Sequence, residues 1–200
     1  PANPPLPVNS AIRAGSKGAR PHPMRVMKFG GTSVGTPDRI EGVLRLVSEA
    51  SVDSRVVVVV SAFGGVTNEL IEASRKATTG SSDWRPGIEA IAKRHADAAL
   101  ALVSPGDRPG LLQVIEQAES ALRELLHGVS LVRECTARTL DSIVSFGERL
   151  SAEIVAAAFR EQGRSARAVD ARSLVVTDPA FGSARVDFGR TDARIRNWWQ

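Results

Sequence analysis

The chain has 200 residues, of which 42% are hydrophobic and 24% charged, as expected for a globular protein with a substantial core. Its formal charge is +4, but Arg13, Lys17 and Arg20 supply three of those charges in an N-terminal stretch that contains no acid. Since the remainder is nearly balanced and the chain has no tyrosine, we expect neither a basic patch nor a stacking platform for nucleic acid.

The cysteines and histidines of the sequence exclude a disulfide-stabilised fold and give no sign of a metal site. Cys135 is the only cysteine, so the chain has no internal disulfide framework and no multi-cysteine metal site, and we expect a structural thiol there. The three histidines are far apart and show no metal-ligand spacing, so no protein metal site is predicted. The longest valine run, residues 56–60, is far too short to cross a membrane.

Residues 1–23 differ in kind from the rest, because they hold six of the eleven prolines and few apolar side chains. We expect a disordered proline-rich extension there, followed by one folded unit over residues 24–200 that begins at Met24. The basic, acid-free character resembles a transit peptide, but the proline density disfavours the amphipathic helix that such peptides form. A cytoplasmic location is therefore expected.

The folded unit opens with a strand, a glycine-rich turn and a helix. The strand covers residues 25–29, and the segment KFGGTSVG follows its end at residues 28–35. Thr36 suits a helix N-cap and Pro37 the first helical position, ahead of apolar residues at helical spacing. Glycines at such a strand-to-helix connection let a backbone approach a phosphate closely.

This turn matches neither common phosphate loop. Gly30 and Gly35 have the spacing of the Walker motif, but Thr36 and Pro37 follow, and Lys28 precedes the turn instead. A lysine at a strand end can still place its charge over a bound phosphate. From the residues alone, a plain Gly-Gly turn with a solvated lysine stays open as the alternative.

The rest of the chain alternates between strand and helix patterns. A valine-rich strand buried on both faces is expected at 55–62, and Gly128 is expected to end the helix that starts near residue 111. The other expected elements are helices at 67–77, 88–102 and 140–158, the last interrupted near 146–147, and short strands at 166–169 and 174–177. This alternation predicts an α/β fold, a doubly wound and mostly parallel sheet with helices on both faces. Ligands of such sheets gather at the carboxyl ends of the strands.

Three segments in register resemble the aspartate kinases of the amino-acid kinase superfamily. They are KFGGTSV at 28–34, VVVVVSAFGGVTN at 56–68 and RTLDSIVSFGERLSA at 138–152. The resemblance implies a three-layer kinase fold and transfer of the γ-phosphoryl group of Mg²⁺-bound ATP to the β-carboxylate of L-aspartate, giving 4-phospho-L-aspartate. This is the first step of lysine, threonine and methionine biosynthesis.

The resemblance also implies roles for individual residues. Lys28 would contact the transferring phosphate, as catalytic and nucleotide-binding residue. The turn residues that would donate around that phosphate are Gly30, Gly31, Thr32 and Ser33. Ser61, Thr67 and Glu148 would bind the amino-acid substrate.

Each substrate residue also has a structural alternative. Ser61 could cap the following turn, and Thr67 could be the N-cap of its helix. Glu148 follows Gly147 in otherwise apolar sequence, an awkward place for an unpaired charge, which favours a functional or ion-paired role.

The chain departs from complete aspartate kinases in its second half. Their Gly-Ser-Asp segment, their Asp-Gly-Val-Tyr-like nucleotide loop and their regulatory domains have no counterpart here, so we expect an N-terminal, substrate-binding part of a kinase domain. We expect weak or no turnover from the isolated chain, and a homo-oligomer of the full-length protein through the regulatory domains. The stretch 126–136 resembles enzymes fused to homoserine dehydrogenase.

Two other hypotheses remain open. One is a non-catalytic aspartate-binding or assembly module derived from the substrate lobe. The other is an unrelated Rossmann-like nucleotide-binding domain, which would leave Thr67 and Glu148 unexplained.

Overall fold

The computed structural model describes residues 23–199. The predicted proline-rich extension therefore lies outside the described residues, except for Pro23. The carbonyl of Pro23 accepts a hydrogen bond from the Arg55 amide at 3.0 Å, directly before the first strand.

Two parallel strands begin the fold. β1 (Met24–Phe29) pairs with β2 (Arg55–Val60), and Lys28 lies opposite Val59 in the register. Between the strands, the chain forms the short helix α1 (Gly31–Val34) and then α2 (Pro37–Ala50), whose N-cap residue is Thr36 as predicted. A parallel pair requires such a crossover connection, and here α2 supplies it.

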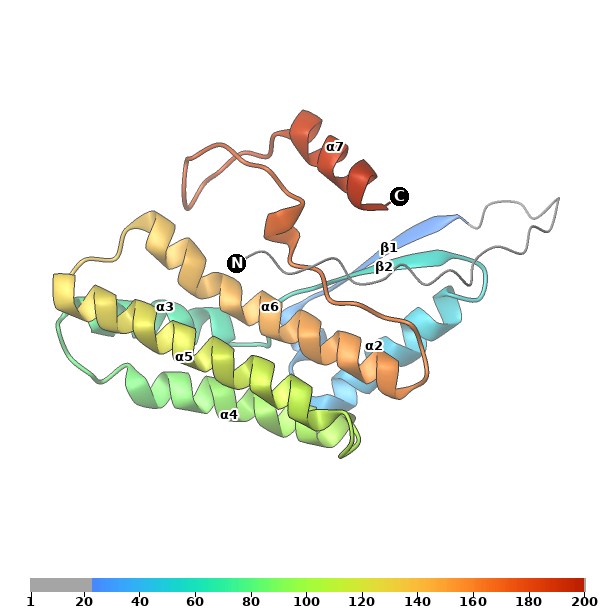
Figure 1. Cartoon of the computed structure of the whole chain (residues 1–200), viewed down its shortest axis with the longest axis horizontal. Helices are drawn as coiled ribbons and strands as arrows, with labels where there is room; N and C mark the ends of the chain where they lie inside the picture. Colours follow the sequence, from blue (N-terminus) through green and yellow to red (C-terminus); the bar gives the residue numbers. More distant parts are fainter. Residues whose placement is uncertain (1–22, 200) are drawn as a thin grey trace.

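Four further helices follow and pack against one another (Figure 1). They are α3 (Val66–Thr78), α4 (Arg85–Leu102), α5 (Arg108–Val132) and α6 (Ala137–Glu161). The core lies between these helices, α2 and one face of the sheet. The α/β fold class is thus confirmed, and the part of the chain described is mostly helical.

The two faces of the sheet differ. Met27 and Phe29 of β1, and alternate valines of β2, pack against the core. On the other face Val26 is 63% and Val59 43% exposed. The prediction that the valine run is buried on both faces is therefore wrong for residues 23–199, because the long helices cover the sheet from one side.

The segment after α6 contains little regular structure. It holds a single turn of 3₁₀-helix, η1 (Ala171–Ser173), a lone antiparallel bridge between Thr177 and Val186, and α7 (Phe188–Trp199). The predicted strands at 166–169 and 174–177 are therefore wrong. Neither stretch joins β1 or β2, so within the described chain their β-branched residues have no ladder to enter.

Gly128 and Gly147 were predicted to end or interrupt their helices, and in the structure neither does. α5 continues past Gly128 because Val129 is buried in the core, and Arg133 takes the left-handed position after the helix end, at φ 55°. α6 likewise runs without a break through Gly147. Both glycines are tolerated because packing on either side outweighs their poor helix propensity.

Candidate functional site

The predicted site loops meet at the carboxyl ends of the two strands. The Ser61 amide donates to the Phe29 carbonyl at 3.1 Å, and the Gly64 amide donates to the Gly31 carbonyl at 3.1 Å. The loop after β1 and the loop after β2 are therefore bonded backbone to backbone. This is the edge of a parallel sheet at which ligands are expected.

Glycines allow this close approach. A Cβ added to Gly31 would lie 2.6 Å from the Ala62 carbonyl oxygen, and one added to Gly147 would lie 2.7 Å from the Ala62 Cβ. Real Cβ atoms do not come so close, so a side chain at either position would push the elements apart. We call the contact of Gly31, Ala62, Gly64 and Gly147 the glycine junction; it joins both loops to α6.

Lys28 is exposed near the end of β1. Within residues 23–199 its side chain makes no hydrogen bond and no ion pair, so its charge is free for a ligand. The turn behind it is more ordered than predicted, because Gly31–Val34 form α1 and the Ser33 amide donates to the Gly30 carbonyl at 2.8 Å. That amide is therefore occupied inside the turn, whereas the Ser33 hydroxyl remains available.

The hydroxyls of Ser61 and Thr67 show neither of the structural roles considered above. α3 begins at Val66 with Gly65 as its N-cap, in the left-handed region at φ 91°, so Thr67 is not the N-cap. In the described part of the chain, neither hydroxyl makes a hydrogen bond. Both half-buried side chains thus keep their bonding capacity for a ligand.

Glu148 differs from expectation. Its side chain is exposed rather than enclosed by apolar residues, because the buried faces of α6 carry its neighbours Gly147 and Leu150. No ion pair holds Glu148 within residues 23–199. Its position one residue after Gly147 places it beside the junction, which keeps it a candidate for the substrate ammonium group.

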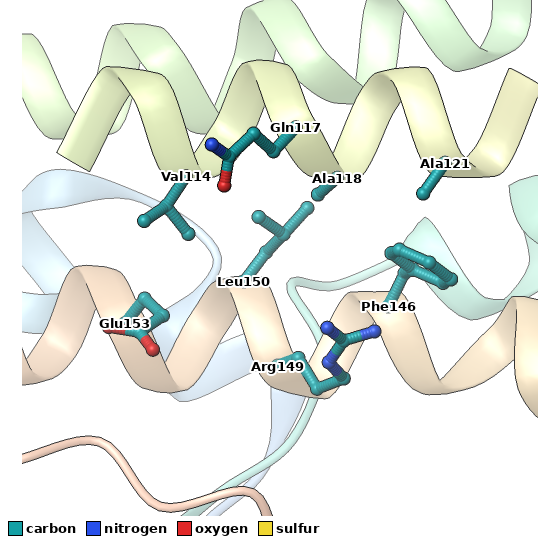
Figure 2. A pocket seen from close by; sticks show the side chains of 8 residues that line it. All are labelled: Val114, Gln117, Ala118, Ala121, Phe146, Arg149, Leu150 and Glu153. Carbon is teal, nitrogen blue, oxygen red and sulfur yellow. The ribbon is translucent and has the colours of Figure 1, made fainter. Parts of the chain in front are cut away.

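Arg149 has a structural role. Its guanidinium lies 4.6 Å from the Phe146 ring centroid and 3.5 Å from the Asp170 carboxylate. Partial burial, followed by the charge of Arg172, lowers the pKa of Arg149. It lines a small groove of about 190 Å³ between α5 and α6, shown in Figure 2, which contains none of the predicted site residues.

A larger open groove, of about 560 Å³, lies beside the turn at residues 30–35. Its lining comes from the end of β1, from Ser33 and from one side of α2. The residues are Phe29, Ser33, Arg39, Gly42, Val43, Arg45, Leu46 and Glu49. Arg39 also donates to the Thr32 carbonyl at 2.8 Å, so a cation braces the turn from this groove.

Two residues near the site, Arg94 and His95, gave no signal in the sequence, because they belong to no motif. Arg94 of α4 reaches both loops, and Phe63 is stacked on the buried His95 with ring centroids 4.5 Å apart. The helical spacing of α4 could have predicted that His95 is buried in the core. No pattern in the sequence could have predicted that Arg94 contacts the two loops.

No cluster of three or more His, Cys, Asp or Glu side chains among residues 23–199 could hold a metal ion. Cys135 is half-buried, and burial raises the pKa of its thiol, which disfavours a nucleophilic role. No helix of the same residues is long and apolar enough to span a membrane.

The sequence profile of the amino acid kinase family matches residues 23–199. The chain belongs to this family.

Within this family, the chain is similar to aspartokinases. Aspartokinase 2, chloroplastic, of Arabidopsis thaliana is 37% identical over 162 residues, covering 80% of this chain and 29% of the relative. A bifunctional aspartokinase/homoserine dehydrogenase, chloroplastic, of Daucus carota is 28% identical over 176 residues, 87% of this chain and 19% of the relative. The chain thus spans less than a third of either relative.

The fold has a solved counterpart. The crystal structure of E. coli aspartokinase III in complex with aspartate and ADP superposes with a TM-score of 0.78 at 25% identity. The match covers 88% of this chain and 37% of that one. The predicted family resemblance and the amino-acid kinase fold are therefore confirmed. Since relatives of both kinds match, the likeness to fused enzymes stays a prediction.

Proposed function

We propose that the protein containing this chain is an aspartate kinase, which transfers the γ-phosphoryl group of Mg²⁺-bound ATP to the β-carboxylate of L-aspartate. The observation that carries the proposal is the glycine junction. It brings the lysine-bearing turn, the loop with Ser61 and Thr67, and the helix with Glu148 to one edge of the sheet. These are the three segments that resemble aspartate kinases.

The proposed roles rest on side-chain groups that have no partner within residues 23–199. Lys28 supplies an unpaired cation for the transferring phosphate, and the turn at Gly30, Gly31, Thr32 and Ser33 cradles it. Phosphoryl transfer needs mainly positioning and charge neutralisation, which such a turn and lysine can provide.

The acceptor would lie on the second loop. The free hydroxyls of Ser61 and Thr67 can donate to an aspartate carboxylate, while Glu148 can accept from the substrate ammonium group. A ligand that carries a carboxylate and an ammonium group, as an amino acid does, can bond to both kinds of group in this set.

Aspartate-dependent release of ADP by the full-length gene product tests the proposal. Wild-type protein should turn over, and Lys28→Met should lower kcat roughly 100-fold or more, because the charge over the phosphate is lost. Lys93→Met is the matched control, since Lys93 is exposed on α4 and, within residues 23–199, pairs only with Asp97. The control should keep its activity.

Calorimetry with L-aspartate separates the alternative function. A wild-type protein that binds aspartate but releases no ADP would be the non-catalytic binding module, and the kinase proposal would be wrong. Equal activity of Lys28→Met and wild type would remove Lys28 from the site while leaving the activity itself intact.

The cellular setting is also proposed. A single cysteine without a disulfide partner in the chain is compatible with the reducing cytoplasm, where we place the full-length protein as a homo-oligomer. Fractionation of the source cells and the native mass of the purified protein test these two points separately.

A further inference from the structure

We infer that Arg94 is a positioning residue that fixes the phosphate turn (residues 30–35) relative to the acceptor loop (residues 61–67). This inference rests on the proposed kinase function and adds a residue to it that lies outside all three motifs. Arg94 belongs to α4, between the second and the third motif in the sequence.

One guanidinium group joins both loops. Its Nη1 donates to the Gly64 carbonyl at 2.8 Å, and its Nη2 donates to the Gly35 carbonyl at 3.2 Å. Gly35 ends the phosphate turn, and Gly64 lies between Ser61 and Thr67 in the acceptor loop. The two bonds therefore tie the two halves of the proposed site to a helix that contributes to neither.

The surroundings hold this guanidinium in place. Arg94 is half-buried, and its Cζ lies 5.8 Å from the centroid of the Phe63 ring. Phe63 is 1% exposed and stacks on His95, the next residue of α4, at an interplanar angle of 11°. The acceptor loop is thus anchored to α4 through a ring contact as well as a hydrogen bond.

The link that Arg94 makes between the two loops matters because the proposed reaction takes place between two ligands, one on each loop. The γ-phosphate would lie on one loop and the acceptor carboxylate on the other, and their separation decides the rate. A misplacement of about 1 Å can cost roughly 100-fold in rate. The direct bond between Gly64 and Gly31 alone leaves the far end of the turn, at Gly35, without a link to the acceptor loop.

The fork of an arginine suits this position. Two donors on one planar group can reach two carbonyls on separate loops, whereas the single ammonium of lysine is a point charge without that geometry. Arg94→Lys therefore keeps the charge and loses the bridge. Arg94→Met keeps an unbranched aliphatic side chain and loses both the charge and the bridge.

Steady-state kinetics and calorimetry on the full-length protein test the inference. Arg94→Met should lower kcat roughly 100-fold, while the Kd values of ATP and of aspartate, each measured alone, change less than about 3-fold. Each ligand alone still finds its own loop intact, and only their relative placement is lost. Arg94→Lys should recover at most about a tenth of the wild-type kcat.

Matched controls separate positioning from stability. Lys93→Met, one residue away on the exposed side of α4, should match wild type in kcat, and the melting temperature of every variant is recorded. Wild-type kcat in Arg94→Met overturns the inference. So does a parallel loss of kcat and of both affinities, which indicates a folding role. An inactive wild type instead overturns the proposed function.

Discussion

The glycine junction and the segment after α6 are built on opposite principles. At the junction, Gly31 and Gly147 leave no room for a methyl group, and the contacts are backbone to backbone or backbone to core. In the segment from residue 162 to 199, Gly163 and Gly182 have open space around them, and most residues are exposed. The first region is closely packed, whereas the second is held mainly by exposed polar contacts.

The bonds of the two regions differ in the same way. The C-terminal segment is held by exposed polar pairs, such as Arg172 on Asp170 at 2.6 Å, which holds the pKa of Asp170 below its usual range. Such pairs contribute little to stability. A rigid junction beside a loosely held segment suggests that precision is concentrated where two ligands would have to meet.

The largest effect is expected from a methyl group at the junction. Gly147→Ala should lower the free energy of unfolding by about 1–2 kcal/mol, because overpacking against Ala62 outweighs the gain in helix propensity. Gly128→Ala is the matched helical control. It has no atom within 4 Å and should raise the free energy of unfolding by about 0.5–1 kcal/mol.

Urea unfolding of both variants measures this contrast. Opposite signs support the close packing at Gly147, and stabilisation by both alanines would show that α6 can move away from Ala62 without cost. Aspartate-dependent ADP release should fall in Gly147→Ala alone, because Glu148 and Ala62 shift together.

The same contrast explains what the sequence could predict. Local rules located β1, β2 and the start of α2, because Pro37 and the apolar spacing act within one turn. They failed at Gly147 and at 174–177, where the outcome depends on distant residues: Ala62 packs against the glycine, and within residues 23–199 the stretch 174–177 forms only a lone bridge to Val186 and does not join the sheet. The motifs indicated Lys28 and Ser61 as candidate site residues. Arg94 bonds to two backbone carbonyls, and because every residue has one, the sequence gives no sign of this contact.

A smaller effect on stability is expected from pH, through the buried His95 that stacks on Phe63. His95 is fully buried, its Nδ1 donates to the Ile91 carbonyl at 2.7 Å, and its Nε2 has no partner in residues 23–199. Burial is the main cause that lowers the pKa of His95, and the charge of Arg94 adds to it, against the opposing effect of the Ile91 bond.

The sign follows from proton uptake. Below about pH 6.5 the unfolded chain binds a proton at His95 that the folded chain does not, so stability falls as the pH drops toward the lowered folded pKa. The slope contributed is at most about 1.4 kcal/mol per pH unit. His95→Phe should remove it between about pH 5.5 and 7, whereas the exposed His127→Gln should not. Equal slopes in wild type and His95→Phe would contradict the assignment.

The smallest global effect is expected in the C-terminal segment. The Thr191 hydroxyl accepts from the buried Val176 amide at 2.9 Å, and this bond ties α7 to the stretch before it. Thr191→Val keeps the shape and leaves that amide unpaired, at about 1–3 kcal/mol locally. Because the segment shares few contacts with the core, we expect the loss to appear as faster amide exchange in residues 174–191.

Hydrogen exchange distinguishes a local opening from a global one. Amides of β2 and α6 should keep their wild-type protection in Thr191→Val, and the urea midpoint should move little. Thr79→Val, which removes an exposed hydroxyl bond to the Lys76 carbonyl at 2.8 Å, should change neither region. If β2 lost protection together with residues 174–191, the C-terminal segment would be part of the same cooperative unit as the junction, and the contrast between the two regions would disappear.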